Sequence, residues 1–433
     1  MSSLNIDFGM LHNFYIEHLK DTILPFWLNN SYDREYGGYF TCYSNDSSKR
    51  ISTDKYIWSQ GRMVWVMSKL SKMDIFSKEE REEFLRQAEH TLDFVLKHCF
   101  LDDDMTCAFL LSREGIPKVQ KEGLGLAPST FADSFVALAL IAYMEASGDS
   151  SHCETLTLLF DSIWKRYQNG QFRTSPFYLP PQTSYHAIPM IQLNLCNEYA
   201  NFLTHMGEKQ KAGEIYGIAS GLYHTILNTF VTEHDSLLEM VRKDGGTEGR
   251  LLYSYVNPGH VLEDCWFMLT AAIHNQDQES MEKIFAVIKR SFLLGWDDIF
   301  GGIRYYVHKD GGIPRGTTDG EEEALAAEQI LHDCNDKLWW PNTEGLYASL
   351  LAYSLTGQTQ FLDMFSRLQE YTFLTFPNPD HEVGEWIQIR DRQGRPFTEE
   401  VGGRLPVKDP YHITRDLILL ISLTHVLEQR DNK

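Results

Sequence analysis

The chain has 433 residues, of which 43% are hydrophobic and 23% charged, a composition typical of a globular protein. Its formal net charge of -21 argues against a nucleic-acid partner, because no basic surface is available to neutralise phosphates. No apolar run reaches the length of a membrane span, the first residues lack the pattern of a signal peptide, and seven cysteines without a CxxC pair indicate reduced thiols. We therefore expect a cytoplasmic protein with no membrane partner.

Apolar residues recur with the 3.6-residue period of amphipathic helices along the whole chain. Several of the predicted helices have a proline at or near their start, where its fixed φ angle suits the first turn. The predicted ranges are 8–29, 56–74, 78–98, 129–147, 151–168, 187–206, 209–229, 257–275, 279–294, 338–355, 359–375 and 410–429.

A turn pattern recurs between these helices. Asp33-Arg-Glu-Tyr-Gly-Gly resembles Asp297-Asp-Ile-Phe-Gly-Gly, and weaker copies begin at or near Asp380, Asp103 and Asp235, with a degenerate one expected near Asn169. Most copies run into an alternating strand and a turn that ends in glycine, which predicts local hairpins. Those turn glycines are Gly115, Gly245, Gly311 and Gly394.

Six repeats of helix, hairpin and helix predict a ring of helical hairpins. No proline- or serine-rich linker divides the chain, so we expect one domain over residues 1–433. The predicted fold class is all-α, an (α/α)6 barrel with short β-hairpins between the helices. The helix after each hairpin is the more apolar one, as an inner-ring helix should be, and polar residues near the starts of these helices would converge on one mouth. They are Arg62, Asp133, His186, His260, Glu344 and His412.

Two histidines occupy matching positions in the first turn of predicted inner helices. The two stretches are Asn257-Pro-Gly-His260 and Asp409-Pro-Tyr-His412, in which Asn or Asp is the expected N-cap and proline the first helical residue. The partial positive charge at a helix N-terminus disfavours the imidazolium, so each histidine is kept neutral and able to accept a proton. Although a lone histidine is usually structural, this matched pair indicates a proton-shuttling enzyme.

Other residues are candidates for supporting roles. Glu263 lies one turn after His260 and is expected to orient it, as the carboxylate does in a triad. Arg62 would be costly to bury unpaired, so it pairs with a carboxylate such as Glu344 or points at a ligand oxygen. Arg415 is expected to hold His412 or a substrate hydroxyl. The remaining substrate-binding candidates are Trp339 in the Trp-Trp-Pro stretch, Trp386 at the mouth, and His186.

Three alternatives remain open on the residues alone. His260 with Glu263 has the spacing of half a metal site, but no second such pair is nearby, so we expect no metal. A glycoside hydrolase or lyase of the same fold would use a carboxylate pair, for which Glu263 and Glu344 are the candidates. The third alternative is a protein-binding module without catalysis. Phosphate-binding loops of the GxxxxGK[ST] and strand-linked GxGxxG types are absent.

Several stretches in chain order resemble the N-acylglucosamine 2-epimerase family. They are YIWSQGRMVW (56–65), CAFLLSREG (107–115), VNPGHVLEDCWF (256–267), WDDIFGGIRYY (296–306), KLWWPNTEGLYA (337–348), GEWIQIRDRQGRP (384–396) and PYHITR (410–415). The resemblance implies an (α/α)6 barrel, a homodimer, and inversion at carbon 2 of an N-acylated sugar or a related epimerisation or aldose–ketose isomerisation. It implies that His260 and His412 are the acid/base pair, supported by Arg62, Glu263 and Glu344.

The same resemblance implies that no cofactor is required. Some family members respond to ATP as an allosteric activator, for which this sequence has no recognisable site. Of the possible substrates we favour N-acetylglucosamine interconverting with N-acetylmannosamine. Asn342, the PYHITR segment and His186 are closer to the family branches that act on unsubstituted sugars, such as cellobiose epimerases and mannose isomerases, which are the alternative.

Overall fold

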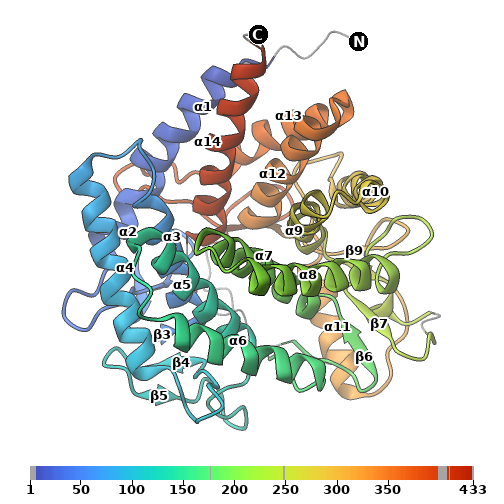
Figure 1. The fold of residues 1–433 in the computed structure, drawn as a ribbon. Helices are drawn as coiled ribbons and strands as arrows, with labels where there is room; N and C mark the ends of the chain where they lie inside the picture. The colour runs from blue at the N-terminus through green and yellow to red at the C-terminus, as the bar shows by residue number, and fades with distance from the viewer. Residues whose placement is uncertain (1–5, 176, 247–248, 398–406, 409, 432–433) are drawn as a thin grey trace.

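Two concentric rings of helices make up the molecule (Figure 1). The computed structural model describes residues 6–175, 177–246, 249–397, 407–408 and 410–431. The inner helices are α3 (Ile57–Leu70), α5 (Phe131–Ser147), α7 (Ala187–His205), α9 (Pro258–His274), α12 (Trp339–Thr356) and α14 (Tyr411–Asp431). The outer helices are α4 (Lys78–His98), α6 (Cys153–Gln168), α8 (Lys209–Thr229), α10 (Gln278–Gly295) and α13 (Thr359–Thr375), completed by α1 (Phe8–Glu17), η1 (His18–Ile23) and α2 (Leu24–Asn30).

The inner ring is closed. Each inner helix contacts the next one in the chain, and α14 contacts α3. Every inner helix also packs on an outer one, and for the last helix that partner is the first of the chain, α1. This arrangement confirms the (α/α)6 barrel. Because the ring closes only when the first and last helices pack together, we propose that the chain forms a single domain.

The predicted helices are confirmed within a few residues, with two differences. The first predicted helix contains a π-helical stretch, η1, between α1 and α2. One helix was missed altogether: α11 (Glu321–Asp333). Its apolar face is narrow, with Ala327 and Ile330 as its buried aliphatic residues, so the 3.6-residue pattern is weak. The helix is fixed instead by tertiary contacts, including the ion pair between Glu323 and Arg250.

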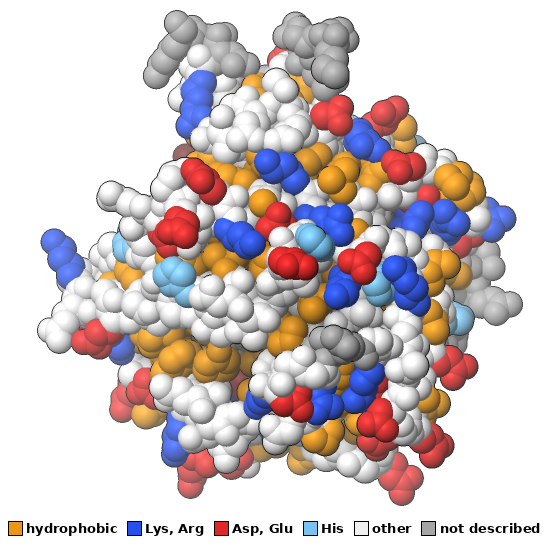
Figure 2. Space-filling model, turned by 90° about the vertical axis from the view of Figure 1, so that its right-hand side faces the viewer, with side chains coloured by type: hydrophobic (Ala, Val, Ile, Leu, Met, Phe, Trp, Pro, Cys, Tyr) orange, Lys and Arg blue, Asp and Glu red, His pale blue; other side chains and the backbone are white. Residues whose placement is uncertain are grey.

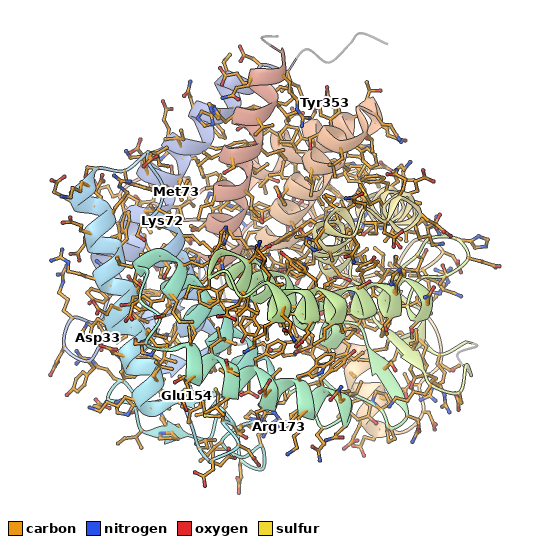
Figure 3. All side chains as sticks on the ribbon, viewed as in Figure 1. Asp33, Lys72, Met73, Glu154, Arg173 and Tyr353 are labelled. Atoms are coloured by element: carbon orange, nitrogen blue, oxygen red, sulfur yellow. The ribbon has the colours of Figure 1, made fainter. Side chains whose placement is uncertain are left out.

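The repeated turns are built around a buried aspartate. Asp33, labelled on the loop at the left of Figure 3, accepts hydrogen bonds from Lys55 Nζ (3.0 Å) and Arg113 Nε (2.9 Å). Asp297 has the same neighbours in its own repeat, Lys337 Nζ at 3.4 Å and Arg392 Nε at 2.7 Å. Each lysine stands two residues before an inner helix, so the ion pair connects the turn to the inner ring.

The paired glycines of these turns are required by the backbone. Gly37 and Gly38 both have a φ of +82°, and Gly301 and Gly302 have φ values of +75° and +74°. These left-handed conformations are strained for residues with a side chain. The turn glycines Gly115, Gly245, Gly311 and Gly394 also have positive φ angles, so the predicted turns are confirmed.

The predicted hairpins are present, and strands also pair between repeats, which the sequence did not predict. In four places the strand before an inner helix pairs with a strand that follows the next outer helix. These pairs are β3 (Lys55–Tyr56) with β4 (Leu110–Leu111), β6 (Thr183–Tyr185) with β7 (Met240–Arg242), β8 (Tyr255–Val256) with β9 (Val307–His308), and β10 (Lys337–Leu338) with β11 (Ile389–Arg390). The local pairs are β4 with β5 (Pro117–Lys118) and β1 (Cys42–Tyr43) with β2 (Arg50–Ser52). The cross-repeat pairing carries residues of one repeat to the start of the neighbouring inner helix.

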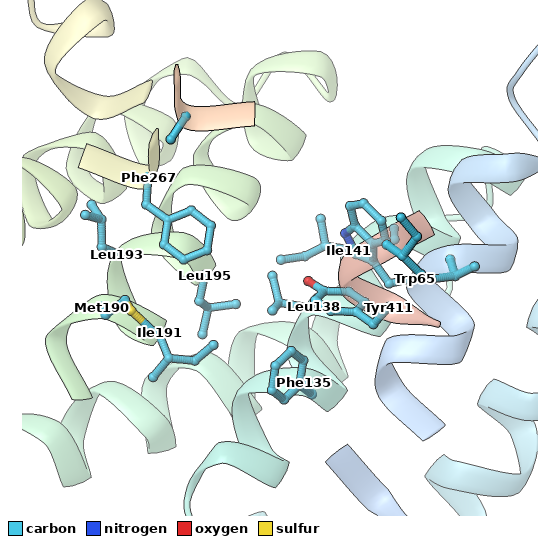
Figure 4. Packing of buried hydrophobic residues seen from close by; sticks show 14 of the residues in the cluster. Trp65, Phe135, Leu138, Ile141, Met190, Ile191, Leu193, Leu195, Phe267 and Tyr411 are labelled. Atoms are coloured by element: carbon cyan, nitrogen blue, oxygen red, sulfur yellow. The ribbon is translucent and has the colours of Figure 1, made fainter. Parts of the chain in front are cut away.

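Apolar side chains of the inner helices fill the centre of the ring. In Figure 4, Met190, Ile191 and Phe267 lie on one side and face Phe135 and Tyr411 on the other. On the outside, acidic and basic side chains are interspersed among apolar ones over the face shown in Figure 2. Among the described residues, none of the helices combines the length and apolar character needed to cross a bilayer.

Candidate active site

A cavity of about 240 Å³ opens at one end of the inner ring. All six inner helices contribute lining residues from their N-terminal halves, so the predicted convergence of these helix starts on one mouth is confirmed. The polar lining includes Arg62, Asn194, His260, Glu263, His412 and Arg415, and the remaining walls are largely aromatic. Ligand sites are typically roughly 300–1,000 Å³, so this cavity suits a single sugar better than an oligosaccharide.

His260 stands in the first turn of α9, as predicted. The side chain of Asn257 caps the helix by accepting a hydrogen bond from the His260 backbone N–H (3.3 Å), and Pro258 is the first helical residue. The imidazole Nδ1 of His260 lies 2.8 Å from Glu239 Oε1. Burial alone would raise the pKa of Glu239, but the imidazoles of His260 and His186 beside it outweigh burial and lower that pKa to about 2. An ionised carboxylate only accepts, so Nδ1 is the donor and Nε2 is the atom left to take a proton.

Glu239, which the sequence analysis missed, is positioned by the cross-repeat strands. It stands just before β7, its carbonyl accepts from the His186 backbone N–H (2.9 Å), and its own N–H donates to the Tyr255 carbonyl (3.3 Å). This bridge sets its side chain beside α9. The prediction that Glu263 orients His260 is corrected: the carboxylate on His260 Nδ1 is that of Glu239.

His412, in the first turn of α14, has an equivalent partner. Its Nδ1 lies 2.7 Å from Glu344 Oε1 and 3.8 Å from Glu263 Oε1. The guanidinium of Arg415 bridges the two carboxylates and lies 3.4 Å from His412 Nδ1. Arg415 thus contacts His412 and both of its carboxylate neighbours from the cavity wall. Asp409, the predicted N-cap of this helix, lies outside the described residues.

The indole of Trp340 lies between the two imidazoles. Its ring centroid is 5.3 Å from that of His260 and 5.4 Å from that of His412. Trp340 and its neighbour Trp339 both line the cavity, so the predicted role of Trp339 in the wall agrees with its position. The indole therefore fixes the spacing of the two histidines.

Arg62 and Glu344 do not pair with each other. The guanidinium of Arg62 lies over the rings of Trp58, Phe135 and Tyr411, with centroid distances of 4.8, 4.4 and 4.8 Å, and it lines the cavity. Glu344 is fully buried and does not line the cavity. Its carboxylate accepts from Trp266 Nε1 (2.9 Å) and is bound by Arg415. Glu344 thus supports His412 from behind, and its predicted contact with substrate is corrected.

Two further candidates lie away from the cavity. Trp386 was expected at the mouth, but it is fully buried, stacks on Phe376 and donates from Nε1 to His18 Nε2 (2.8 Å). His186 was expected to contact substrate, but it is also fully buried and its Nε2 lies 2.8 Å from Asp264 Oδ2. Neither side chain lines the cavity.

One cluster among the described residues has the geometry of a cation site. Ligand atoms of Glu263, Glu344 and His412 lie within 4.8 Å of one another. The guanidinium of Arg415 contacts both carboxylates and supplies a positive charge between them. These contacts explain the cluster as the set of groups that holds His412 in place.

Comparison with known proteins shows the family of this chain. The model of the N-acylglucosamine 2-epimerase (GlcNAc 2-epimerase) family matches residues 38–415. The N-acylglucosamine 2-epimerase of Bos taurus is 31% identical over 424 residues, covering 95% of this chain and 90% of the bovine protein. The chain belongs to the N-acylglucosamine 2-epimerase family.

Solved structures show the same fold in relatives of lower identity. The cellobiose 2-epimerase of Bacillus thermoamylovorans is 18% identical with a TM-score of 0.75, over 96% of this chain and 99% of that one. The crystal structure of a D-mannose isomerase is 15% identical with a TM-score of 0.72, over 95% and 97% of the two chains. At these identities the likeness establishes the (α/α)6 barrel and leaves the substrate to be argued from the cavity.

Proposed function

We propose that this protein is a sugar 2-epimerase that interconverts N-acetylglucosamine and N-acetylmannosamine. The observation that carries the proposal is the pair of histidines, His260 and His412, that line one cavity from matching helix starts. Each has its Nδ1 on a buried carboxylate, which leaves Nε2 of each ring for proton transfer. Family membership supports the reaction class.

The chemistry requires two proton transfers at one carbon. In the open-chain sugar, one histidine removes the proton from carbon 2, and the electrons of that C–H bond form a double bond to carbon 1 as the carbonyl oxygen becomes an oxyanion. The other histidine then donates a proton to the opposite face of carbon 2, and the carbonyl re-forms. We assign Arg62, a cation in the cavity wall, to the oxyanion, because a fixed positive charge there stabilises the developing negative charge.

The cavity offers what an acetamido group needs. Asn194 lines it from α7, is 5% exposed, and its side-chain amide makes no hydrogen bond within the described part of the chain. Met190 and Ile191 lie one helical turn earlier on the same face and supply apolar surface for a methyl group. We therefore propose that Asn194 binds the acetamido group.

Asn342, which pointed towards unsubstituted sugars, does not bear on the substrate. It is fully buried and does not line the cavity. Its amide is used structurally, accepting from the Ile303 backbone N–H (2.9 Å) and donating to the Leu338 carbonyl (2.7 Å). This placement removes one of the arguments for a cellobiose- or mannose-type activity.

The two carboxylates predicted for a glycoside hydrolase, Glu263 and Glu344, are not arranged as a catalytic pair. Hydrolysis needs two carboxylates on either side of a bond in the cavity. Of the two candidates, Glu263 lines the cavity but Glu344 does not, and both are bound to the same guanidinium. An epimerase fits this arrangement better than a hydrolase.

Proton exchange at carbon 2 in deuterated water tests the proposal. N-Acetylmannosamine, mannose, glucose and cellobiose are incubated with the protein, with and without ATP, and followed by NMR. We expect deuterium at carbon 2 and fastest turnover of N-acetylmannosamine. His260→Asn and His412→Asn should each lower turnover about 10²–10⁴-fold while remaining folded. Cleavage of oligosaccharides without exchange, or neither reaction, would refute the epimerase; mannose turnover at least tenfold faster would refute the substrate.

Three further properties of the protein are proposals. We propose a homodimer, which light scattering on the purified protein measures, and a cytoplasmic location. We also propose that the reaction needs no cofactor and that ATP acts, if at all, as an allosteric activator. The ATP arm of the turnover assay tests the latter directly.

A further inference from the structure

A chain of buried titratable groups leads away from His260. Glu239 Oε1 binds His260 Nδ1 (2.8 Å), Glu239 Oε2 lies 3.8 Å from His186 Nδ1, and His186 Nε2 lies 2.8 Å from Asp264 Oδ2. His186, Glu239 and Asp264 are each at most 2% exposed. A histidine enclosed by two carboxylates and sealed from solvent is electrostatically favoured as its cation.

The second catalytic histidine has a matching arrangement. His412 contacts a buried carboxylate, Glu344, and a buried cation, Arg415, contacts both of them. Behind His260 stands Glu239, and behind Glu239 stands His186. The two halves of the site therefore share one design, an imidazole, a buried carboxylate and a buried positive charge.

We propose that His186, held as the imidazolium between Glu239 and Asp264, is a positioning residue that sets the protonation of His260 through Glu239. This inference rests on the proposed function of His260 as a proton-transfer group. It assigns no contact with substrate to His186, which agrees with its absence from the cavity wall.

The balance of burial and charge supports a protonated His186. Burial lowers the pKa of His186, but the hydrogen bond to Asp264 and the negative charges of Asp264 and Glu239 outweigh burial and raise it to about 9. Burial also raises the pKa of Asp264, and the hydrogen bond and charge of His186 oppose that rise. The ring is therefore charged at neutral pH.

The other groups facing this chain do not replace the charge. From α9, Glu263 acts on Asp264 as a further negative charge. The phenols of Tyr185 and Tyr255 face Glu239 from β6 and β8, and burial raises the pKa of both, so they are neutral. Among the described groups that act on Glu239, His186 is the one besides His260 that can carry a positive charge.

This charge keeps His260 ready to accept a proton. The negative charge of Glu239 favours the imidazolium of His260, and the positive charge of His186 on the other carboxylate oxygen weakens that pull. Without His186, the His260–Glu239 pair binds a proton more tightly. Less of His260 would then be available as the base when substrate arrives.

The test is the pH profile of kcat for His186→Gln. We expect the acid limb to move to higher pH by about one unit or more, the shift typical of one charge at this range, with KM little changed. Asp264→Asn, which withdraws the acceptor that holds the proton on His186, should move the limb in the same direction. In a Glu239→Gln background, His186→Gln should move it no further, because the carboxylate that links the two histidines is gone.

Asn197→Ala is the matched control. Asn197 is also buried on α7 and donates to the Phe267 carbonyl of α9 (2.9 Å), but it carries no charge and does not line the cavity. This variant should melt at a lower temperature with its pH profile unmoved. If His186→Gln behaves in the same way, folded and with an unshifted acid limb, the inference is wrong.

An NMR titration of the His260 ring separates this inference from the proposed function. The resonance is assigned by its loss in His260→Asn and followed with pH in the wild-type protein and in His186→Gln, without any sugar. A higher midpoint in His186→Gln supports the relay even if no sugar is epimerised, and equal midpoints refute it even if one is. If His186→Gln does not fold, Asp264→Asn provides the same comparison.

Discussion

Replacing Glu239 by Gln should lower kcat at least tenfold and leave KM nearly unchanged. Glu239 is 2% exposed and does not line the cavity, so the substrate loses no contact. The change replaces a charged hydrogen-bond acceptor on His260 Nδ1 by a neutral one. Hydrogen bonds to charged groups contribute about 1.5–3 kcal/mol and neutral ones about 0.5–1.5. A difference of about 1.4 kcal/mol in stabilisation of the imidazolium is a factor of ten in rate.

The loss is larger if the new amide turns its N–H₂ towards the ring. Nδ1 would then be the acceptor, the neutral imidazole would carry its proton on Nε2, and no base would face the cavity. The equivalent exchange of carboxylate for amide in a catalytic triad lowers kcat by about 10⁴. The expected range is therefore about 10- to 10⁴-fold.

The assay is steady-state turnover of N-acetylmannosamine across pH, with thermal melting to confirm the fold. Glu323→Gln is the control, because Glu323 is equally buried and ion-paired with Arg250 but does not line the cavity. It should lower stability and leave kcat within about threefold. A folded Glu239→Gln protein that also keeps a third of its activity would show that Glu239 does not tune His260.

Two other changes test the substrate and the repeated turns. Asn194→Ala should raise KM for N-acetylmannosamine about ten- to a hundredfold, the equivalent of 1–3 kcal/mol for a lost buried hydrogen bond, and change KM for mannose much less; an equal effect on both sugars would remove Asn194 from acetamido recognition. Asp33→Asn should lower the free energy of unfolding by about 3–5 kcal/mol near neutral pH, because Lys55 is left buried without its anion. Burial opposes it, but hydrogen bonds from Arg113 and Lys55 lower the pKa of Asp33 from 3.8 to about 2. A depressed folded-state pKa gives stability that is complete above about pH 4 and lost as pH falls to about 2, so urea unfolding should show the difference shrinking in that window; a pH-independent difference would contradict the ion pair.

The sequence determined the features that depend on neighbouring residues. A helix repeats every 3.6 residues, so its apolar face and its ends can be recognised from residues only a few positions apart in the chain. This locality is why most helices, the glycine turns and the capped first turn of His260 were predicted correctly. It also explains why α11, with its narrow apolar face, was not found.

Part of the missed site was still present in the repeats. Six residues before the turn glycines Gly115, Gly245 and Gly394 stand Phe109, Glu239 and Gln388. The backbone carbonyls of all three accept from the first residue of an inner helix or from the residue just before it, and Phe109 lines the cavity. Aligning the hairpins by their turns would have placed Glu239 near an inner helix start.

The partners of the catalytic histidines were decided only by the tertiary structure. Glu263 is three residues from His260 but lies on Arg415 and near His412, whereas the carboxylate on His260 comes from a strand of another repeat. Trp386, which was predicted at the mouth of the cavity, is likewise buried in the core. The position of a residue in a helix fixes the direction in which its side chain points from the helix axis. Which group the side chain contacts in that direction depends on how the ring closes and on the register of the strands between repeats. Those distances are set by packing, and spacing along the chain does not contain them.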